Sequence, residues 1–476
     1  MKRRRLFFGL LLLCAAGCAI GPGYQRPAVE APAAWKASES SVNWKEASPN
    51  DAVPTGEWWV IFGDTELNEL QTKALAANLD IQAAFARVTQ ARAVARQAVA
   101  GGLPSVEATP AYSHYQRTRS SFGGSGTFAG DTYQIPFDIS YELDLWGRVR
   151  RGFEAAHAQA QASEAAYRTV LLSLRAEVAR AYFLLRTFDS EMQTLEQAIS
   201  LRRDALDLVT QRMQAGIVNE LDVARAKTEL ASAEENAIDL RRRRAELENG
   251  LAVLCGEPAS SFSLPVRPLL LEIPQVPAGL PSELLERRPD VAKAERELMA
   301  ANARIGVAMA AFFPVVRLTG SGGFESAEID SLFEQDSRTW SLGPSVSIPL
   351  FSGGRAKSNL QAAKAQFEEV AALYRQQVLV AFCEVEDALV NLRLRAEQAQ
   401  THQRALDSSR QAAELSSTRY KQGLVNYLEV VDAERSRLQA EREAVNLLSY
   451  RLVSTVLLIK ALGGSWEPAS APTSSP

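Results

Sequence analysis

The stretch "TYQIPFDISYELDLWG", residues 132–147, alternates between apolar and polar side chains along almost its whole length. The odd-numbered residues have large apolar side chains, and the even-numbered residues include the carboxylates of Asp138, Glu142 and Asp144. A period of two predicts a β-strand with one apolar and one wet face. Such strands occur in soluble sheets with one solvated face and in membrane β-barrels with a wet lumen. The apolar positions are Tyr133, Ile135, Phe137, Ile139, Tyr141, Leu143 and Leu145.

The N-terminus predicts export and a lipid anchor. A basic start at residues 2–5 and an apolar run at 6–13 form a secretory signal, and this run is too short to span a bilayer. The small residues before Cys18 resemble a bacterial lipobox, in which Cys18 becomes the acylated first residue. The alternative is an ordinary signal with an incidental cysteine. By resemblance to lipoprotein sorting rules, Ala19 does not retain the chain in the inner membrane, so we expect it in the outer membrane of a Gram-negative cell.

Composition argues against nucleic-acid binding and catalysis. With 52 Lys plus Arg against 56 Asp plus Glu, the chain is mildly acidic and a poor binder of polyanions. The run Arg241–Arg244 lies in a Glu-rich helical segment, so we interpret it as a solvated helix face. Cys255 and Cys383 lack metal-site spacing and are interpreted as packing residues. No enzyme, cofactor or metal site is expected, because nucleophile motifs are missing and the histidines stand alone: His114, His157 and His402.

An internal repeat extends through most of the chain. Shifted by 207 positions, residues 139–256 align without a gap onto residues 346–463. The most similar segments are "RMQAGIVNELDV", 212–223, and "RYKQGLVNYLEV", 419–430. The repeat predicts two tandem halves with the same structure.

The predicted strands are too few to form a closed sheet within one chain. The alternation recurs in "TWSLGPSVSIPLF", 339–351. Upstream of each such strand, a shorter β-like run after Pro104 or Pro314 leads into a Gly/Ser-rich loop, at 120–131 and 320–331. No later stretch is apolar enough for a transmembrane helix, so membrane entry requires a β-barrel. Four strands cannot close one, because the smallest barrels use about eight, and we therefore expect an oligomer.

Each pair of strands is followed by a long helical segment. No proline occurs between Pro136 and Pro258, or between Pro349 and Pro468. A helix over residues 148–214 would be roughly 100 Å long at 1.5 Å per residue, which suits the crossing of a periplasm. Apolar residues step by three or four and predict coiled-coil seams. The stripes are Leu171, Leu174, Val178, Ala181, Leu185 and Phe188, then Val378, Phe382, Val385, Leu389 and Leu392.

Both helical segments reverse direction at a glycine. Gly216 and Gly423 are predicted helix ends, and "NELD" and "NYLE" are capping-box-like starts of the next helices. The result is two helical hairpins whose tips lie far from the strands.

The arrangement of strands followed by long helical hairpins, present in two tandem halves, resembles the outer-membrane factor family of TolC-like efflux ducts. The opening "GCAIGPGYQRPAVEAPAAW", 17–35, and the two tips resemble its NodT-type lipoprotein branch. The resemblance implies an α+β membrane protein: a trimeric 12-stranded β-barrel, with four strands per chain, continued by an α-helical coiled-coil tunnel in the periplasm. It implies an exit duct for drugs or other small molecules, with a periplasmic adaptor and an inner-membrane pump as partners. The alternatives are a type I protein-secretion duct and a non-channel periplasmic coiled-coil lipoprotein.

The resemblance also implies a division of the chain. The signal peptide is 1–17, and residues 18–60 are the lipid-anchored segment, which wraps the middle (equator) of the tunnel. The first repeat is 61–257, the linker in the same equatorial region is 258–282, the second repeat is 283–463 and the C-terminal tail is 464–476.

In the family, the tips form the closed periplasmic end and the adaptor contact. The charge reversal between Arg225 and its counterpart Asp432 indicates that the two tips have different surroundings. If symmetry-related Asp432 carboxylates meet near an axis, they repel one another unless each pairs with a cation, and Arg419 is the nearest candidate in the sequence. The alternative is that Arg419 and Asp432 form an ordinary surface ion pair. The implied gate residues are Arg419, Tyr420, Leu428 and Asp432. The implied tip residues are Arg212, Gly216, Asn219, Leu221, Asp222, Gly423, Asn426 and Glu429. Turn and cap roles could also explain Gly216, Asn219, Gly423 and Asn426.

Overall fold

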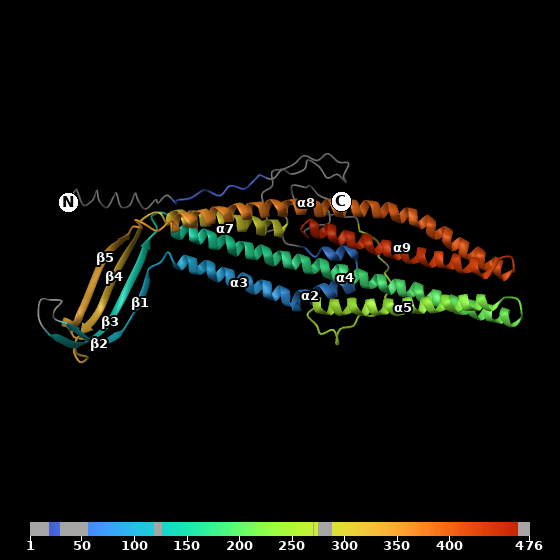
Figure 1. The fold of residues 1–476 in the computed structure, drawn as a ribbon, viewed down its shortest axis with the longest axis horizontal. Helices are drawn as coiled ribbons and strands as arrows, with labels where there is room; N and C mark the ends of the chain where they lie inside the picture. Colours follow the sequence, from blue (N-terminus) through green and yellow to red (C-terminus); the bar gives the residue numbers. More distant parts are fainter. Residues whose placement is uncertain (1–18, 29–55, 119–125, 270, 275–287, 465–476) are drawn as a thin grey trace, which may run out of the picture. The chain divides into compact units, whose positions relative to one another are not determined.

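The computed structural model describes residues 19–28, 56–118, 126–269, 271–274 and 288–464 (Figure 1). Cys18, most of the expected wrap and part of the expected linker therefore lie outside the described residues. The chain divides into two compact units. The first holds Met1–Ala28, Ala86–Glu164 and Lys293–Arg375, and the second holds Val29–Phe85, Ala165–Ala292 and Gln376–Pro476.

The first unit contains an antiparallel sheet with the order β1-β3-β4-β5, in which β2 also pairs with β3 (Figure 1). Thr109 and Pro110 separate β1 from β2, and both strands pair with β3, so the two fill one strand position. The sheet thus has the four strand positions that the sequence predicts. The strands are β1 (Ser105–Ala108), β2 (Ala111–Thr118), β3 (Thr127–Leu143), β4 (Val315–Ser326) and β5 (Arg338–Ser347).

The strand register places apolar residues beside apolar residues and polar residues beside polar residues on neighbouring strands. Cross-strand neighbours point to the same face of a sheet, and successive rows point to opposite faces. One row is apolar and the next is polar, which matches the alternation within residues 132–147. The row through Ile139 holds Val106, Ile139, Gly320 and Leu342; the row through Ser140 holds Ser105, Ser140, Thr319 and Gly343. The sheet therefore has one apolar and one polar face, and Trp340 and Leu342 of the apolar face are 83% and 80% exposed.

Two expectations about the strands were wrong. The segment 320–331 was expected to be a loop, yet β4 continues to Ser326. Its glycines allow a close approach to β3, because a Cβ on Gly323 would overlap the backbone of Ile135 and Pro136. The strand expected over 339–351 ends at Ser347, so the apolar side chains beyond that residue are not part of the sheet.

The long helix after the first strands has the predicted bounds, and it recurs in the second half. Helix α4 is Arg148–Gln214 and α5 is Glu220–Leu254, and their counterparts α8 and α9 are Arg355–Lys421 and Tyr427–Ala461. Every bound in the second half lies 207 residues after its counterpart in the first. The other helices among the described residues are η1 (Trp58–Phe62), α2 (Thr65–Ala77), α3 (Leu79–Ala100), α7 (Pro289–Ala310) and η3 (Gln335–Ser337).

The second unit has the main apolar core. Trp58 and Phe62 of η1 and Leu67 of α2 pack with Tyr182 and Phe183 of α4, and all five are almost fully buried. Residues of α5 and α9 complete this core. The predicted stripe of α4 contributes to it through buried Leu174, Val178, Ala181 and Leu185.

Two further sequence interpretations need correction. Cys255 is buried, and burial raises its pKa to about 11, but Cys383 is exposed and therefore does not pack in the core. By length and composition, helix α9 is apolar enough to cross a membrane, so the expectation that no later stretch is apolar enough for a transmembrane helix was wrong. Half of its most apolar stretch is buried inside the protein, as in a core helix.

Candidate functional site at the hairpin tips

Each hairpin tip is held by backbone hydrogen bonds that the sequence dictates. At the end of α4, Ile217 N donates to Arg212 O and Gly216 N donates to Met213 O, both at 2.9 Å. This is a Schellman motif, which requires the left-handed backbone of Gly216, φ 74°. Asn219 then caps α5, because its side-chain oxygen accepts a 3.1 Å hydrogen bond from Asp222 N.

The second tip repeats these contacts. Leu424 N donates to Arg419 O and Gly423 N donates to Tyr420 O, both at 2.9 Å. Asn426 caps α9 by accepting a 3.2 Å hydrogen bond from Glu429 N. The turn and cap roles predicted for these residues are therefore confirmed, whereas their role in adaptor contact stays a prediction.

Arg212 joins the first tip to the second. Its guanidinium donates 3.1 Å hydrogen bonds to the carbonyl oxygens of Tyr420 and Lys421. It also lies 4.5 Å from the centroid of the Tyr420 ring, within the range of a cation–π interaction. Arg212, predicted as an adaptor contact, thus has a structural role inside the chain as well.

The four predicted gate residues have different environments. Tyr420 is 6% exposed and packs on Tyr427 with ring centroids 5.5 Å apart, in a small core between the tips. Arg419, Leu428 and Asp432 are exposed. No ion pair between Arg419 and Asp432 occurs within the described part of the chain, so the latch stays a prediction about an assembly.

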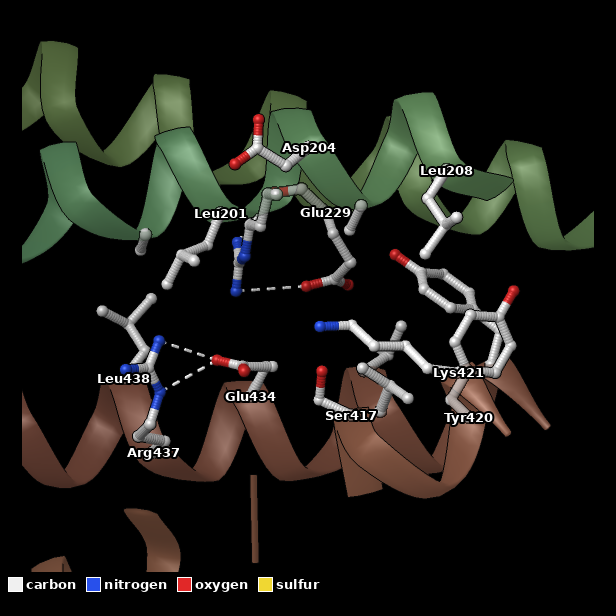
Figure 2. Close-up of a pocket in the computed structure, with 16 residues that line it drawn as sticks. Leu201, Asp204, Leu208, Glu229, Ser417, Tyr420, Lys421, Glu434, Arg437 and Leu438 are labelled. Atoms are coloured by element: carbon white, nitrogen blue, oxygen red, sulfur yellow. Dashed lines mark hydrogen bonds and ion pairs between the residues drawn. The ribbon is translucent and has the colours of Figure 1, made fainter. Parts of the chain in front are cut away.

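A cavity of about 240 Å³ lies between the two hairpins, next to this small core. Figure 2 shows its walls, which come from α4 and α5 on one side and from α8 and α9 on the other. Tyr420 and Tyr427 are among the residues that line it, and burial raises the pKa of Tyr427 to about 12. Because both hairpins line it, the volume of this cavity depends on how the hairpins are packed.

Buried charges link the two hairpins beside this cavity. The Glu229 side chain is 8% exposed and accepts a contact from Arg202 at 3.3 Å and a close ion pair from Arg435. Arg202 also donates a 2.7 Å hydrogen bond to the Glu229 carbonyl oxygen. Burial lowers the pKa of Arg202, although the Glu229 carboxylate opposes this shift. A second ion pair, Glu191–Arg442 at 3.1 Å, joins α4 to α9.

A separate ionic cluster holds the linker after α5. Asp189 is fully buried and contacts Arg186 at 2.6 Å and Arg244 at 2.7 Å. The Arg186 and Arg244 guanidinium groups donate to the carbonyl oxygens of Pro265 and Leu264, at 2.7 and 2.8 Å. The solvated-face interpretation of Arg241–Arg244 was therefore wrong for Arg244. Glu248, four residues away, is one of its partners at 3.1 Å, but Asp189 and the Leu264 carbonyl lie 55 and 20 positions away and could not be inferred from the local pattern.

The same linker is attached to the start of α2. The Arg267 guanidinium contacts the Asp64 carboxylate at 2.7 Å, and the Tyr182 hydroxyl donates to Asp64 at the same distance. Burial raises the pKa of the Asp64 carboxyl, but the hydrogen bonds from Tyr182 and Leu67 and the charge of Arg267 outweigh burial, and the net pKa lies below the usual value.

In the first unit, the segment that follows Cys18 is attached to two helices. Arg26 forms an ion pair with Glu295 of α7 at 3.0 Å and donates to the Tyr374 hydroxyl of α8 at 3.1 Å. Asn302 donates to the carbonyl oxygen of Pro22 at 3.0 Å. A chain anchored at Cys18 would therefore be held at residues 19–28 as well.

Comparisons with known proteins agree with this geometry. The chain matches the family described as "Outer membrane efflux protein" over residues 70–257 and 280–464. The solvent efflux pump outer membrane protein SrpC of Pseudomonas putida is 34% identical, and the match covers 98% of this chain and 99% of SrpC. The cation efflux system protein CusC of Escherichia coli O6:H1 is 32% identical, with 96% and 99% covered. A solved structure of the outer-membrane channel OprN has a TM-score of 0.87 and 32% identity, and covers 95% of this chain and 100% of that chain.

Proposed function

The chain belongs to the outer membrane efflux protein family, and from this premise we propose that it forms the exit duct of a tripartite efflux system. The predicted family and the predicted location, the outer membrane with a large periplasmic portion, are confirmed by the match. The adaptor, the inner-membrane pump and the exported compounds belong to the proposal.

The observation that carries the proposal is the two-faced sheet. The row through Ile139 is apolar and exposed, whereas the row through Ser140 is polar. A sheet with lipid on one side and a wet lumen on the other needs this arrangement. Since unpaired strand edges cannot face lipid, the outer edges of one sheet must pair with other sheets. Three chains with four strand positions each would supply the 12 strands of a closed barrel, and we propose this trimer with the long hairpins as its periplasmic tunnel.

The exported compounds are proposed to be small molecules, including drugs. The names of these relatives support export of small compounds, since SrpC belongs to a solvent efflux pump and CusC to a cation efflux system. These names favour efflux over type I protein secretion. The sheet argues against a non-channel coiled-coil lipoprotein, because such a protein would expose the apolar face of the sheet to water.

Reconstitution tests the duct. We expect the purified protein to migrate as a heat-modifiable trimer and to conduct ions in planar bilayers. A cell that lacks the protein should become more sensitive to solvents and antibiotics, and the full-length chain should restore its resistance. If the purified trimer conducts no ions, even after substitutions in its tips, the protein does not form a duct and has a structural role instead.

The lipid anchor at Cys18 is a further part of the proposal. Cys18→Ser should abolish acyl labelling and change signal processing. One acyl chain gives marginal membrane binding, and the sheet and residues 19–28 would still hold the protein. We therefore expect slower assembly in the mutant without loss of the outer-membrane location. Acyl incorporation equal to that of the parent would refute the lipoprotein assignment.

A further inference from the structure

The first hairpin contacts the second through a surface that the internal repeat duplicates. The residues of this surface belong to α4 and α5 and either line the cavity or pair with α9: Glu191, Ala198, Ala205, Leu208 and Glu229. All are buried or half-buried, and Figure 2 shows Leu208 and Glu229 directed toward the second hairpin. Their counterparts, 207 positions later on α8 and α9, are all exposed: Gln398, Ala405, Ala412, Leu415 and Ser436.

The second hairpin contributes the other half of this contact from α9. Its residues line the cavity or form ion pairs with the first hairpin: Tyr427, Val431, Arg435, Leu438 and Arg442. Their counterparts, 207 positions earlier on α5, are also all exposed: Glu220, Ala224, Thr228, Ala231 and Glu235. Each hairpin therefore has one half of the contact in use and an exposed duplicate of the other half.

The two exposed duplicates fit a second copy of the chain. The hairpins of one chain already contact each other through other residues, so the duplicate on α8 and α9 is available to the duplicate on α5 of a neighbouring copy. Such a contact joins two different surfaces head to tail, and a ring of copies covers every duplicate. Leu415 is 55% exposed in the single chain and would be covered in such a ring.

Uncharged residues replace the closest ion pair of the internal contact. Within the chain, the Glu229 carboxylate pairs with Arg435, and the Glu229 side chain is 8% exposed. The same arrangement between two copies places Ser436 of one copy against Thr228 of the other. Two hydroxyl side chains bring no like charges together, and they bury no carboxylate that needs a partner.

A neutral and a charged residue replace the second ion pair. Within the chain, the Glu191 carboxylate lies 3.1 Å from the Arg442 guanidinium. Their counterparts are Gln398 and Glu235, and a glutamine amide can donate a hydrogen bond to a carboxylate. The contact between copies is therefore complementary at both positions, but it lacks both ion pairs and should be weaker than the contact within a chain.

We propose that copies of this chain assemble through these two duplicates, so that the second hairpin of one copy packs on α5 of the next in the arrangement that the two hairpins have within a chain. The inference rests on the proposed trimer and names its contact surface. It concerns the helices beyond the tips, because Met213 takes the position of Tyr420 in the repeat and offers Arg419 no ring to cover.

Cross-linking tests which residues meet. In the full-length protein with Cys383→Ser, which removes an exposed thiol, Thr228→Cys and Ser436→Cys are combined and treated with a short bismaleimide. Heat-denatured samples of the trimer should contain covalent dimers and trimers, whereas each single cysteine variant should give monomers alone. The control pair is Ser436→Cys with Glu246→Cys, an exposed residue about 27 Å farther along α5 at 1.5 Å per residue, and it should also give monomers alone.

The outcomes separate this inference from the proposed function. A heat-modifiable trimer that gives no covalent oligomer with Thr228→Cys and Ser436→Cys would overturn the inference. Equal yields of covalent oligomer from the control pair would overturn it as well, since they would show unspecific collisions. A protein that never forms the trimer would refute the proposed duct, so the two failures can be distinguished.

An ion pair introduced at the same position gives a second test. Ser436→Glu with Thr228→Arg places between copies the charges that Glu229 and Arg435 have within the chain. We expect this trimer to dissociate into monomers at a temperature several degrees above that of either single variant. Ser436→Glu with Thr228→Glu is the matched control and should dissociate below the parent, because like charges repel. Equal dissociation temperatures of the two double variants would show that these residues do not meet and would refute the contact.

Discussion

The Arg212 guanidinium lies over the Tyr420 ring and donates a 3.1 Å hydrogen bond to the carbonyl oxygen of the same residue. The carbonyls that end a helix lack intrahelical partners and carry a partial negative charge. The Tyr420 carbonyl already accepts from Gly423 N, and Arg212 adds a charged donor to it and to the Lys421 carbonyl at the end of α8. Its counterpart in the second half, Arg419, is exposed. Two arginines that match in sequence therefore have different roles, and the first joins the hairpins.

Arg212→Ala should loosen the contact between the tips. Hydrogen bonds to charged groups contribute about 1.5 to 3 kcal/mol, and this change should lower the unfolding temperature and raise the conductance of the resting channel. Arg203→Ala, which removes a pair between two exposed side chains at 3.0 Å, is the control and should change neither value. Equal conductance of the parent and Arg212→Ala would show that this contact does not hold the tips.

Arg419→Ala combined with Asp432→Ala tests the predicted gate. Both side chains are exposed in the single chain, so any latch they form must be completed by other copies. The double mutant should show a larger open-state conductance and admit large antibiotics. Leu428→Ala should widen the passage less, since it leaves the charges in place. If single-channel recordings find the double mutant as closed as the parent, the two residues do not form a gate.

The two faces of the sheet can be distinguished by adjacent substitutions. Ile139→Arg should impair trimer assembly, because an arginine on the lipid side near mid-bilayer costs about 2 to 4 kcal/mol. Ser140→Arg, one residue later on the polar face, should assemble normally and change conductance. Heat-modifiable trimer yield and single-channel recordings measure the two effects. The same phenotype from both substitutions would refute the assignment of faces.

Gly423→Val should deform the second tip. Gly423 has φ 78°, and a left-handed backbone costs other residues about 1 to 2 kcal/mol. We expect reduced efflux at a normal protein level, because the helices on either side remain packed. Gly423→Asn is the control, since asparagine tolerates this conformation, and it should keep most of the efflux. Normal drug resistance in Gly423→Val would argue against docking through this tip.

The Asp64 carboxyl should make the protein sensitive to acid. Its pKa in the folded chain lies below the ordinary 3.8, so the stability it contributes is present above that value. This stability is lost as the pH falls through the folded pKa. Asp64→Asn keeps a helix-capping side chain but should be less stable at pH 7, and its stability should fall less on acidification. Urea titrations at pH 7 and pH 3 would measure this, with the exposed Asp207→Asn as control. An unchanged acid response in Asp64→Asn would contradict the assignment.

The sequence by itself determined the helices and the two-faced strand. The long proline-free segments, the glycines at 216 and 423 and the asparagine caps act on neighbours a few residues away, so their effect can be read locally. Helix α4 accordingly has the predicted bounds, Arg148–Gln214. The alternation of β3 predicted its apolar and polar faces for the same reason.

Only the tertiary structure decided which distant groups meet. Gly320 to Ser326 has the composition of a loop but forms a strand, because glycine lets β4 approach the bulky residues of β3. Arg244 pairs with Asp189, 55 positions away, and Arg212 binds a carbonyl 208 positions away. Periodicity and turn residues report on one element at a time. The choice of a partner across elements depends on packing and on how burial strengthens a charge contact, and neither is visible in a local pattern.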